Sequence, residues 1–275
     1  MYIFKSLFNI LTVNLATLAK FIGASFLAIL SFNVFANASS IESESNYQQC
    51  LQNNNLPQLS FSERLKPYQE LMATNTGVYV LEGETESLVT RAWLSDNAEH
   101  TIDVQYFIFS RDNIGVIATD FLLKAAERGV KVRVLVDDIM VDASGNYLAK
   151  LDNHPNISIK IYNPLANIGK NFVQKLYHLT TTFHDFNQRM HNKALIVDGK
   201  AVITGGRNIA DEYFGYDHRY NFRDRDVFLL GGQVSKVQSS FDIFWHHKLS
   251  VPVAELVKNK SSSLNAAALH EYACN

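Results

Sequence analysis

Hydrophobic and polar residues follow two alternating spacings between residues 77 and 163. Continuous or alternating apolar runs, which are typical of strands, lie at 77–83, 101–109, 131–139 and 157–163. Apolar residues at helical spacing lie between them, at 86–98, 114–129 and 146–154. This order predicts an α/β domain in which right-handed crossovers place helices over the faces of a sheet. The Val-rich run 131–139 has the pattern of a parallel strand buried on both faces, so we expect a largely parallel sheet.

A second set of patterns follows residue 190. The apolar runs 191–197 and 200–204 flank Asp198-Gly199, a dipeptide that is typical of a tight β-hairpin turn. Because a hairpin adds antiparallel strands, the sheet as a whole is predicted to be mixed. The remaining elements predicted here are a strand at 222–230 and an amphipathic helix at 234–249.

Residues 1–38 have the pattern of a targeting segment. A charge-free apolar run, FIGASFLAILSFNVFA, follows Lys20, and Ala36 and Ala38 occupy the small positions of an A-x-A cleavage site. The run is shorter than the ~20 residues of a membrane-spanning helix, which favours a cleaved signal peptide. The apolar stretch before Lys20 leaves a retained anchor open. Both interpretations place the rest of the chain outside the cytoplasm, on the periplasmic or extracellular side, and associated with a membrane.

The rest of the chain is predicted to hold one domain between two looser segments. Residues 39–75, rich in Ser, Asn, Gln and Glu, are expected to form a polar lead-in with one short helix. Residues 76–250 contain the predicted sheet, and residues 251–275 are expected to form a loose tail. Within the domain, residues 163–190 combine basic and aromatic side chains with a single acid. This insertion is interpreted as a rim or lid that faces an anionic substrate or a lipid surface, with a plain surface loop as the alternative.

Composition and charge limit the class of protein. The chain is 47% hydrophobic and 19% charged, as an ordinary globular protein is. Its net charge of −2 gives no long-range attraction to nucleic acid, which disfavours a nucleic-acid partner but leaves a local basic groove open. Cys50 and Cys274 either form a disulfide, which an oxidising compartment permits, or remain thiols in loosely held ends, the interpretation that we favour. No metal-ligand spacing occurs, so no metal site is predicted.

His191 and Lys193 form the candidate reactive pair. Period-two alternation places both side chains on one face of the predicted strand. A neutral histidine can attack phosphorus, and a lysine beside it supplies a fixed cation for phosphate oxygens. Gly205 and Gly206 allow backbone amides to approach the same anion closely, and Asn208 can add a donor. Taken alone, the pair is more typical of an exposed edge strand, so the interpretation depends on the spacing of the surrounding residues.

The full spacing, His191-x-Lys193 followed by Asp198 and by Gly205-Gly206-x-Asn208, resembles the HxKxxxxD (HKD) motif of the phospholipase D superfamily with its trailing glycine-rich element. The similarity spans residues 77–250, with the motif region at 185–212. It is greatest to the N-terminal half of bacterial cardiolipin synthases. Further phrases that carry it are QYFIFSRDNIG, LLKAAERGVKVRVLVDDI, GGRNIADEYFG and FRDRDVFLLGG.

This resemblance implies a role for each matching residue. His191 is expected to be the nucleophile that forms a phosphohistidine intermediate, while Lys193 and Asn208 hold the phosphoryl oxygens. Asp224 is the first candidate for an acid that orients His191. Asp226 is the second candidate, because it lies on the same strand face. Enzymes of this superfamily typically use no metal, and no cofactor is expected.

Three other polar positions have more than one interpretation. Asp198 belongs to the motif, but its place in a tight turn favours bonding to backbone amides over direct catalytic electrostatics. Asp137 and Asp138 close a predicted strand and either border the pocket or cap a helix. His246-x-Lys248 has the spacing of the reactive pair, but no Asp follows at the motif distance, so we interpret it as the polar end of a helix.

Superfamily enzymes normally bring two HKD motifs together, and this sequence holds one. In such enzymes one histidine attacks while the other protonates the leaving alcohol. A single motif implies a homodimer, a separately encoded second half, or a truncated product, and we favour the last two together. The predicted function is phosphatidyl transfer to a lipid alcohol at a membrane surface, which gives cardiolipin or a related lipid. The alternatives are a secreted single-motif nuclease or phosphodiesterase working as a homodimer, and an inactive half that binds lipid or a partner.

Overall fold

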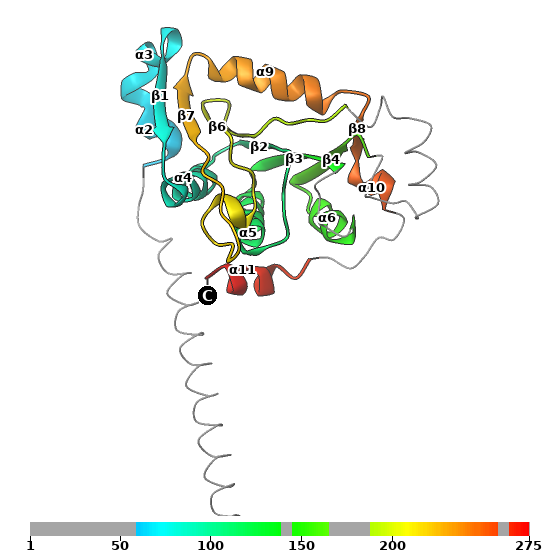
Figure 1. The fold of residues 1–275 in the computed structure, drawn as a ribbon. Helices are drawn as coiled ribbons and strands as arrows, with labels where there is room; N and C mark the ends of the chain where they lie inside the picture. The colour runs from blue at the N-terminus through cyan, green and yellow to red at the C-terminus, as the bar shows by residue number, and fades with distance from the viewer. Residues whose placement is uncertain (1–58, 139–144, 165–187, 258–263, 275) are drawn as a thin grey trace, which may run out of the picture. The chain divides into compact units, whose positions relative to one another are not determined.

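The computed structural model describes residues 59–138, 145–164, 188–257 and 264–274. These residues are arranged around an eight-stranded sheet with the order β1-β7-β6-β5-β2-β3-β4-β8 (Figure 1). The strands are β1 (Thr76–Leu81), β2 (Thr101–Tyr106), β3 (Lys131–Asp137), β4 (Ile157–Tyr162), β5 (Ala194–Val197), β6 (Ala201–Gly205), β7 (Asp226–Gly231) and β8 (Ser250–Pro252).

Parallel pairing is confined to one part of this sheet. Strand β3 pairs in parallel with β2 and with β4. The other neighbouring strands that the structure describes pair antiparallel. The mixed α/β sheet is therefore confirmed, but its parallel part is smaller than the hydrophobic pattern predicted. The reason is that β5, β6 and β7 follow one another as a meander, and β1 joins the outer edge of β7.

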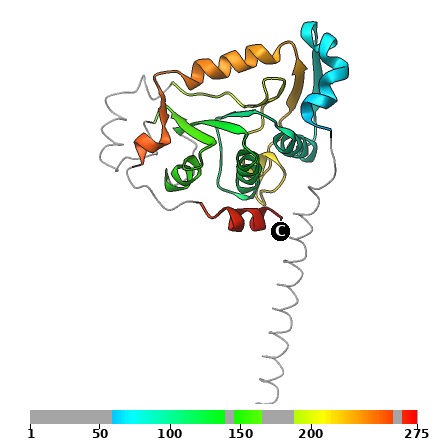
Figure 2. The ribbon, with the colours of Figure 1, turned by 180° about the vertical axis from the view of Figure 1, so that it is seen from behind.

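Helices cover both faces of the sheet (Figures 1 and 2). Val132, Val134 and Val136 of β3 enter the core on one face, whereas Leu135 enters the core on the other. Strand β3 is thus buried on both faces, as its Val-rich pattern predicted. The helices on the first face are α4 (Glu84–Asn97), α5 (Asn113–Glu127) and α6 (Gly145–Asp152), and α9 (Val234–Trp245) covers the second.

Two local sequence signals have the predicted structure. Asp112 caps α5 by accepting a hydrogen bond from the Gly115 N–H at 2.9 Å, and Gly129 follows the helix with a positive φ of 97°. In the β5–β6 hairpin, Asp198 and Gly199 have φ values of 51° and 60°. Positive φ at both central residues is what a tight hairpin turn requires, so the hairpin is confirmed.

The segments before β1 and after α9 are more structured than their composition indicated. The described part of the polar lead-in holds α2 (Phe61–Leu65), η2 (Lys66–Tyr68) and α3 (Gln69–Thr74). The described part of 251–275 continues β8 into α10 (Val253–Leu256) and includes α11 (Ala266–Cys274).

The expectation of a loose C-terminal tail is not met by these residues. Val253 and Leu269 are buried. His270 of α11 contacts Asp120 of α5 through Nδ1 and Glu127 through Nε2, the latter at 3.2 Å. The tail packs because α5 offers acidic partners, which the periodicity of the tail itself does not indicate.

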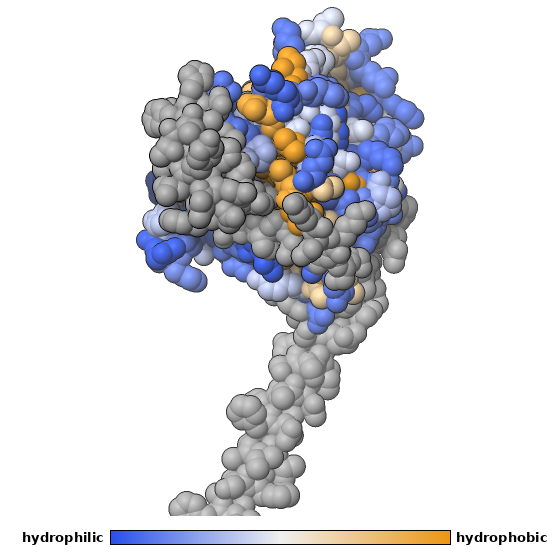
Figure 3. Space-filling view, turned by 90° about the vertical axis from the view of Figure 1, so that its right-hand side faces the viewer, coloured by the Kyte–Doolittle hydropathy of each residue, from blue (hydrophilic) through white to orange (hydrophobic). Residues whose placement is uncertain are grey.

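The edge of the sheet at β8 has an apolar character. Figure 3 views this side and shows a band of hydrophobic residues between hydrophilic ones. Partly buried apolar residues of this edge include Leu249 before β8 and Leu256 and Val257 after it.

Several expectations concern residues outside the described ranges, among them the segment 1–38, most of the insertion 163–190, and Cys50. Cys274 is disulfide-bonded, so the expectation of a free thiol there is wrong. Across the described part of the chain, every helix is too short or too polar to cross a membrane.

Candidate functional site

The predicted site lies at the edge of the sheet where β2, β3 and β4 end. His191 and Lys193 lie directly before β5, which runs antiparallel to β2. Asn208 follows the end of β6, and Asp224 lies directly before the start of β7. Because β5, β6 and β7 alternate in direction, the segments at these strand ends meet at one edge.

His191 and Lys193 contact each other directly. The Lys193 Nζ lies 3.2 Å from Nδ1 and 3.4 Å from Nε2 of His191, and it donates a hydrogen bond to the His191 carbonyl oxygen at 2.8 Å. The Phe107 ring lies against the imidazole, with ring centroids 4.7 Å apart. Lys193 is only 6% exposed, whereas His191 is exposed. An open imidazole ring is thus placed beside a buried cation.

The burial of Lys193 changes its electrostatics. Loss of solvent lowers the pKa of Lys193, and the negative charge of Asp224 opposes this shift. A cation with little solvent around it interacts more strongly with an anion than a hydrated one does. The site therefore favours binding of a negatively charged group next to His191.

Asp137, at the end of β3, anchors the segment that leads to His191. Its buried carboxylate accepts a hydrogen bond from the Met190 N–H at 2.9 Å. On the other side, the Lys193 carbonyl oxygen accepts one from the Thr204 hydroxyl of β6 at 2.8 Å. The backbone is held on both sides of His191, so Asp137 positions the reactive segment. The sequence had left two interpretations of Asp137 open, a residue that borders the pocket or one that caps a helix.

Asn208 is buried and has its amide oriented by neighbours. Its Oδ1 accepts a hydrogen bond from the Ile108 N–H at 3.0 Å, which leaves the NH2 group as the part that can donate to an anion. Tyr213, at the end of η4 (Asp211–Tyr213), lies beside the Asn208 side chain. Burial raises the pKa of Tyr213, and the Asn208 amide opposes the shift. Tyr213 lies in the phrase GGRNIADEYFG, but no spacing rule singled it out.

Gly205 and Gly206 have a role other than the predicted one. The Gly206 N–H donates to the Arg225 carbonyl oxygen at 2.9 Å, so it is not free to bind an anion. A Cβ at Gly206 would lie 2.4 Å from Asp224 Oδ1, and one at Gly205 would lie 2.4 Å from the Arg225 oxygen. A side chain at Gly205 would meet the backbone of Arg225 and Asp226, and one at Gly206 would meet the Asp224 side chain.

Asp224 is a half-buried acid whose charge acts on the pair. It lies within electrostatic reach of Lys193 and of Tyr213. Among the described residues, the His191 ring contacts Lys193 and Phe107, and Asp224 does not hydrogen-bond to it. Asp224 therefore acts on the pair through its charge, and a direct orienting bond to His191 stays a prediction.

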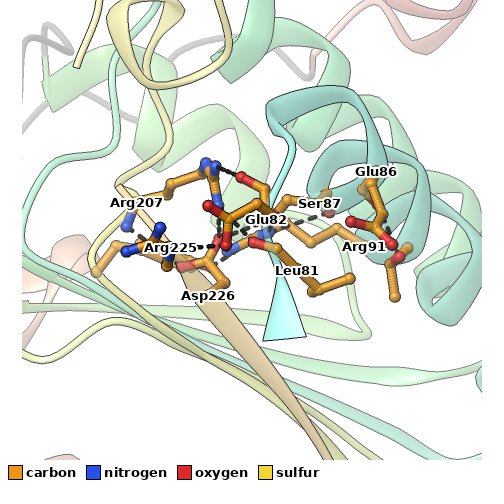
Figure 4. Close-up of polar contacts among 10 residues, drawn as sticks. Leu81, Glu82, Glu86, Ser87, Arg91, Arg207, Arg225 and Asp226 are labelled. Atoms are coloured by element: carbon orange, nitrogen blue, oxygen red, sulfur yellow. Dashed lines mark hydrogen bonds and ion pairs between the residues drawn. The ribbon is translucent and has the colours of Figure 1, made fainter. Parts of the chain in front are cut away.

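Asp226, the second candidate, belongs to a buried network instead (Figure 4). Its carboxylate accepts hydrogen bonds from Ser87 Oγ at 2.7 Å and Arg91 Nη2 at 3.0 Å, both on α4, and from Arg207 Nη1 at 3.3 Å. Asp224 and Asp226 do not share a strand face, because β7 begins only at Asp226.

Arg207 connects this network to the site. It donates to the carbonyl oxygens of Leu81 and Glu82 at 3.1 and 2.8 Å, at the end of β1. Since Arg207 directly precedes Asn208, its bonds to Asp226 and to β1 fix the chain that presents the Asn208 amide. The network thus fixes the position of Asn208 without contacting His191.

Asp198 lies at the opposite end of β5 from Lys193. Its carboxylate accepts three backbone hydrogen bonds, from Glu99 at 2.9 Å, His100 at 2.7 Å and Thr101 at 2.8 Å. At ~3.3 Å per strand residue, it is roughly 16 Å from Lys193. This geometry supports the turn interpretation over direct catalytic electrostatics.

Comparison with known protein families agrees with this arrangement. The family model described as "Cardiolipin synthase, PLD-like domain" matches residues 94–245, more than half of the chain. The chain belongs to this phospholipase D (PLD)-like family.

Individual relatives are longer than this PLD-like chain. Cardiolipin synthase C of Escherichia coli K12 is 37% identical over 207 residues, which cover 71% of this chain and 43% of the relative. An uncharacterized protein of Helicobacter pylori 26695 is 36% identical over 214 residues, or 77% and 41% respectively. The chain thus spans about two fifths of these relatives.

Solved structures give weaker matches. NucT from Helicobacter pylori aligns with a TM-score of 0.45 at 17% identity, and the phospholipase D family member Nuc from Salmonella typhimurium aligns with 0.44 at 18%. Both alignments cover 65% of this chain and 98% of the other.

The PLD-like site combines an open imidazole with donors for an anion. Phe107, which contacts His191, is followed by Ile108, which orients Asn208. The ring, the Lys193 cation and the Asn208 amide are therefore held by adjacent backbone. Within the described ranges, no group of three or more His, Cys, Asp or Glu side chains is placed to hold a metal ion.

Proposed function

We propose that this PLD-like domain transfers the phosphatidyl group of a phospholipid through a phosphohistidine on His191. A neutral ring nitrogen attacks the phosphorus, the bond from phosphorus to the alcohol oxygen breaks, and the phosphatidyl group remains on the ring. A second alcohol or water then attacks the phosphorus and returns the free histidine. The observation that supports this proposal is the exposed His191 ring in contact with the buried cation of Lys193.

Lys193 and Asn208 are proposed to stabilise the phosphoryl oxygens. Negative charge grows on these oxygens as the nucleophile attacks, and donors already in place lower the barrier without reorganising. The Lys193 ammonium lies within 3.4 Å of both His191 ring nitrogens, so an oxygen on the attacked phosphorus falls within its reach. The NH2 group of Asn208, whose Oδ1 is held by the Ile108 N–H, supplies a second donor.

The leaving alcohol needs a proton, which calls for an acid outside this constellation. The sequence carries one HKD motif, and the chain spans 41–43% of its matched relatives. We propose that a second HKD half, for which another copy of this chain is one candidate, supplies a second histidine. The cardiolipin synthase relatives support a lipid alcohol as acceptor, and the segment 1–38 supports action at a membrane on the periplasmic or extracellular side.

Trapping the intermediate tests this proposal. The chain is incubated with phosphatidylglycerol labelled at phosphorus, quenched in denaturant at alkaline pH, and analysed for label on histidine. We expect acid-labile label on wild type and none on His191→Asn. The control is His246→Asn, which removes the exposed histidine of the other HxK pair at the end of α9. Equal labelling of His191→Asn and wild type would exclude His191 as the nucleophile.

The same preparation tests which function the site has. Light scattering gives the mass of the active species, and turnover is measured with phosphatidylglycerol vesicles and with single-stranded DNA. Transfer by a dimer supports the homodimer, and transfer that appears only after adding a second HKD half supports a split enzyme. Cleavage of DNA without any turnover of lipid would replace this proposal with the nuclease alternative.

A further inference from the structure

A loop beside the site exposes a cluster of aromatic rings. The loop comprises residues 213–223, between η4 and β7, and is called the aromatic loop below (yellow in Figure 1). Tyr216, Tyr220 and Phe222 are 54%, 53% and 48% exposed. The Phe222 ring centroid lies 5.0 Å from that of Tyr213 and 5.4 Å from that of Tyr220. Tyr213, Phe222 and Tyr220 therefore form one continuous group of rings, and Tyr216 adds a further exposed ring to the same loop.

The aromatic loop is braced by its own hydrogen bonds. Asp217 Oδ1 accepts from the backbone N–H of Arg219 at 2.6 Å and of Tyr220 at 3.1 Å. The Asn221 side chain accepts a hydrogen bond from the Asp217 N–H at 3.2 Å and donates one to the Asp217 carbonyl oxygen at 3.0 Å. The Phe222 N–H donates to the Glu212 carbonyl oxygen at 2.8 Å. The chain thus holds the rings outward, although burying them would remove apolar surface from water.

The base of the loop is fixed to the site and to the core. Tyr213 lies beside the Asn208 side chain. Asp211, at the start of η4, accepts a hydrogen bond from the Ile114 N–H of α5 at 2.8 Å. The group of rings is therefore held at a constant position relative to the Asn208 amide, and whatever surface these rings contact lies next to the phosphate site.

The charges of the loop favour an anionic surface. The Arg219 side chain is 82% exposed, and Arg223 is exposed. The Asp217 carboxylate is 19% exposed; it accepts the backbone bonds of the loop and lies 3.9 Å from Arg219 Nε, a long ion pair that leaves most of the guanidinium in solvent. Tyrosine rings concentrate at the level of lipid headgroups, and arginine is attracted to anionic lipid surfaces.

We propose that the aromatic loop is the surface through which this site contacts an anionic phospholipid bilayer. The proposal rests on the proposed function, since it names where that site meets its substrate. A phosphodiester in a bilayer lies at headgroup depth, so a braced loop with rings at that depth brings His191 to the phosphorus. The net charge of −2 gives the chain no long-range attraction to a polyanion, so the proposed contact depends on the local rings and arginines of the loop.

The test measures contact with lipid and does not depend on turnover. Tyr220→Trp is placed in the full chain carrying His191→Ala, and its fluorescence is measured in phosphatidylglycerol vesicles with brominated acyl chains. The control is Tyr68→Trp in η2, whose tyrosine is similarly exposed at 55%. Signal from Trp93 and Trp245 is subtracted with the parent chain. We expect strong quenching at position 220 and little at position 68.

Equal quenching at the two positions would overturn the proposal. A second variant, Tyr216→Ser/Tyr220→Ser, is assayed for turnover in the His191-intact chain. We expect about tenfold lower turnover of vesicle lipid with unchanged turnover of a short-chain, monomeric phospholipid. If the double variant instead converts a dimer into monomers, the loop is a protein interface and the proposal fails. Quenching without turnover, both for the chain alone and after a second HKD half is added, would leave the lipid contact standing and refute only the proposed function.

Discussion

Replacing Asp226 by Ala should unfold the domain at a much lower temperature. The Asp226 carboxylate is fully buried between Arg91 and Arg207, whose side chains are 8% and 2% exposed. Its removal leaves two buried guanidinium groups without a counter-charge. Breaking a buried ion pair in this way costs about 3–5 kcal/mol. For a domain of this size, each kcal/mol lowers Tm by about 2–4 °C, so we expect a fall of about 6–20 °C.

The assay is thermal unfolding followed by circular dichroism, with Glu82→Gln as the control. Glu82 pairs with Arg225 at 2.6 Å, but both side chains are largely exposed, so this change should leave Tm within experimental error of wild type. Comparable Tm values for Asp226→Ala and Glu82→Gln would refute the argument, because the buried network would then contribute no more than a surface pair. Below its lowered Tm, Asp226→Ala should also lose affinity for phosphate, since Arg207 no longer fixes Asn208.

Three further predictions concern single residues of the motif region. Burial lowers the pKa of Lys193 from its usual value of 10.5, so Lys193 in the free protein loses its proton at a lower pH than an exposed lysine does. We therefore expect kcat/KM to fall at alkaline pH with a midpoint below 10.5. A midpoint at the usual value would contradict this. Gly206→Ala places a Cβ 2.4 Å from Asp224 Oδ1, so turnover should fall at least about tenfold while circular dichroism stays native, and full activity would show that the segment can move. Asp198→Ala leaves three backbone N–H groups without their acceptor, so urea titrations should show a free energy of unfolding lower by about 1–3 kcal/mol. The folded protein should keep its activity on a soluble substrate. Loss of activity without loss of stability would favour the electrostatic role of Asp198.

Elements with a strong local pattern could be predicted from the sequence. The Val-rich strand β3, the capped helix α5 and the turn at Asp198-Gly199 follow from periodicity, a cap residue and positive φ, which are properties of neighbouring residues. Local rules suffice in these cases because the decisive interactions lie within a few residues. His191 and Lys193 contact each other as predicted, but both lie before β5, so alternation within a strand does not explain their placement.

The sequence could not show features that depend on distant partners. Asp226 belongs to a buried network because Arg91 on α4 and Arg207 after β6 both hydrogen-bond to its carboxylate. The C-terminal helix packs because Asp120 of α5 lies opposite His270. Likewise, the antiparallel pairing of β1 with β7 and of β2 with β5 depends on which strand ends lie side by side, and periodicity does not record this.

The hydrogen bonds between Asp198 and residues 99–101 also set the register of the strand that follows the reactive pair. They lock the far end of β5 to the start of β2, where Ile102 pairs with Val197. A slip of one residue would turn every side chain of β5 to the opposite face and would shift the preceding segment that carries His191 and Lys193. The distance between Lys193 and Asp198 in the motif is thus a structural requirement. An inserted or deleted residue between them would break either the Asp198 hydrogen bonds to residues 99–101 or the position of His191 and Lys193 at the other end of β5.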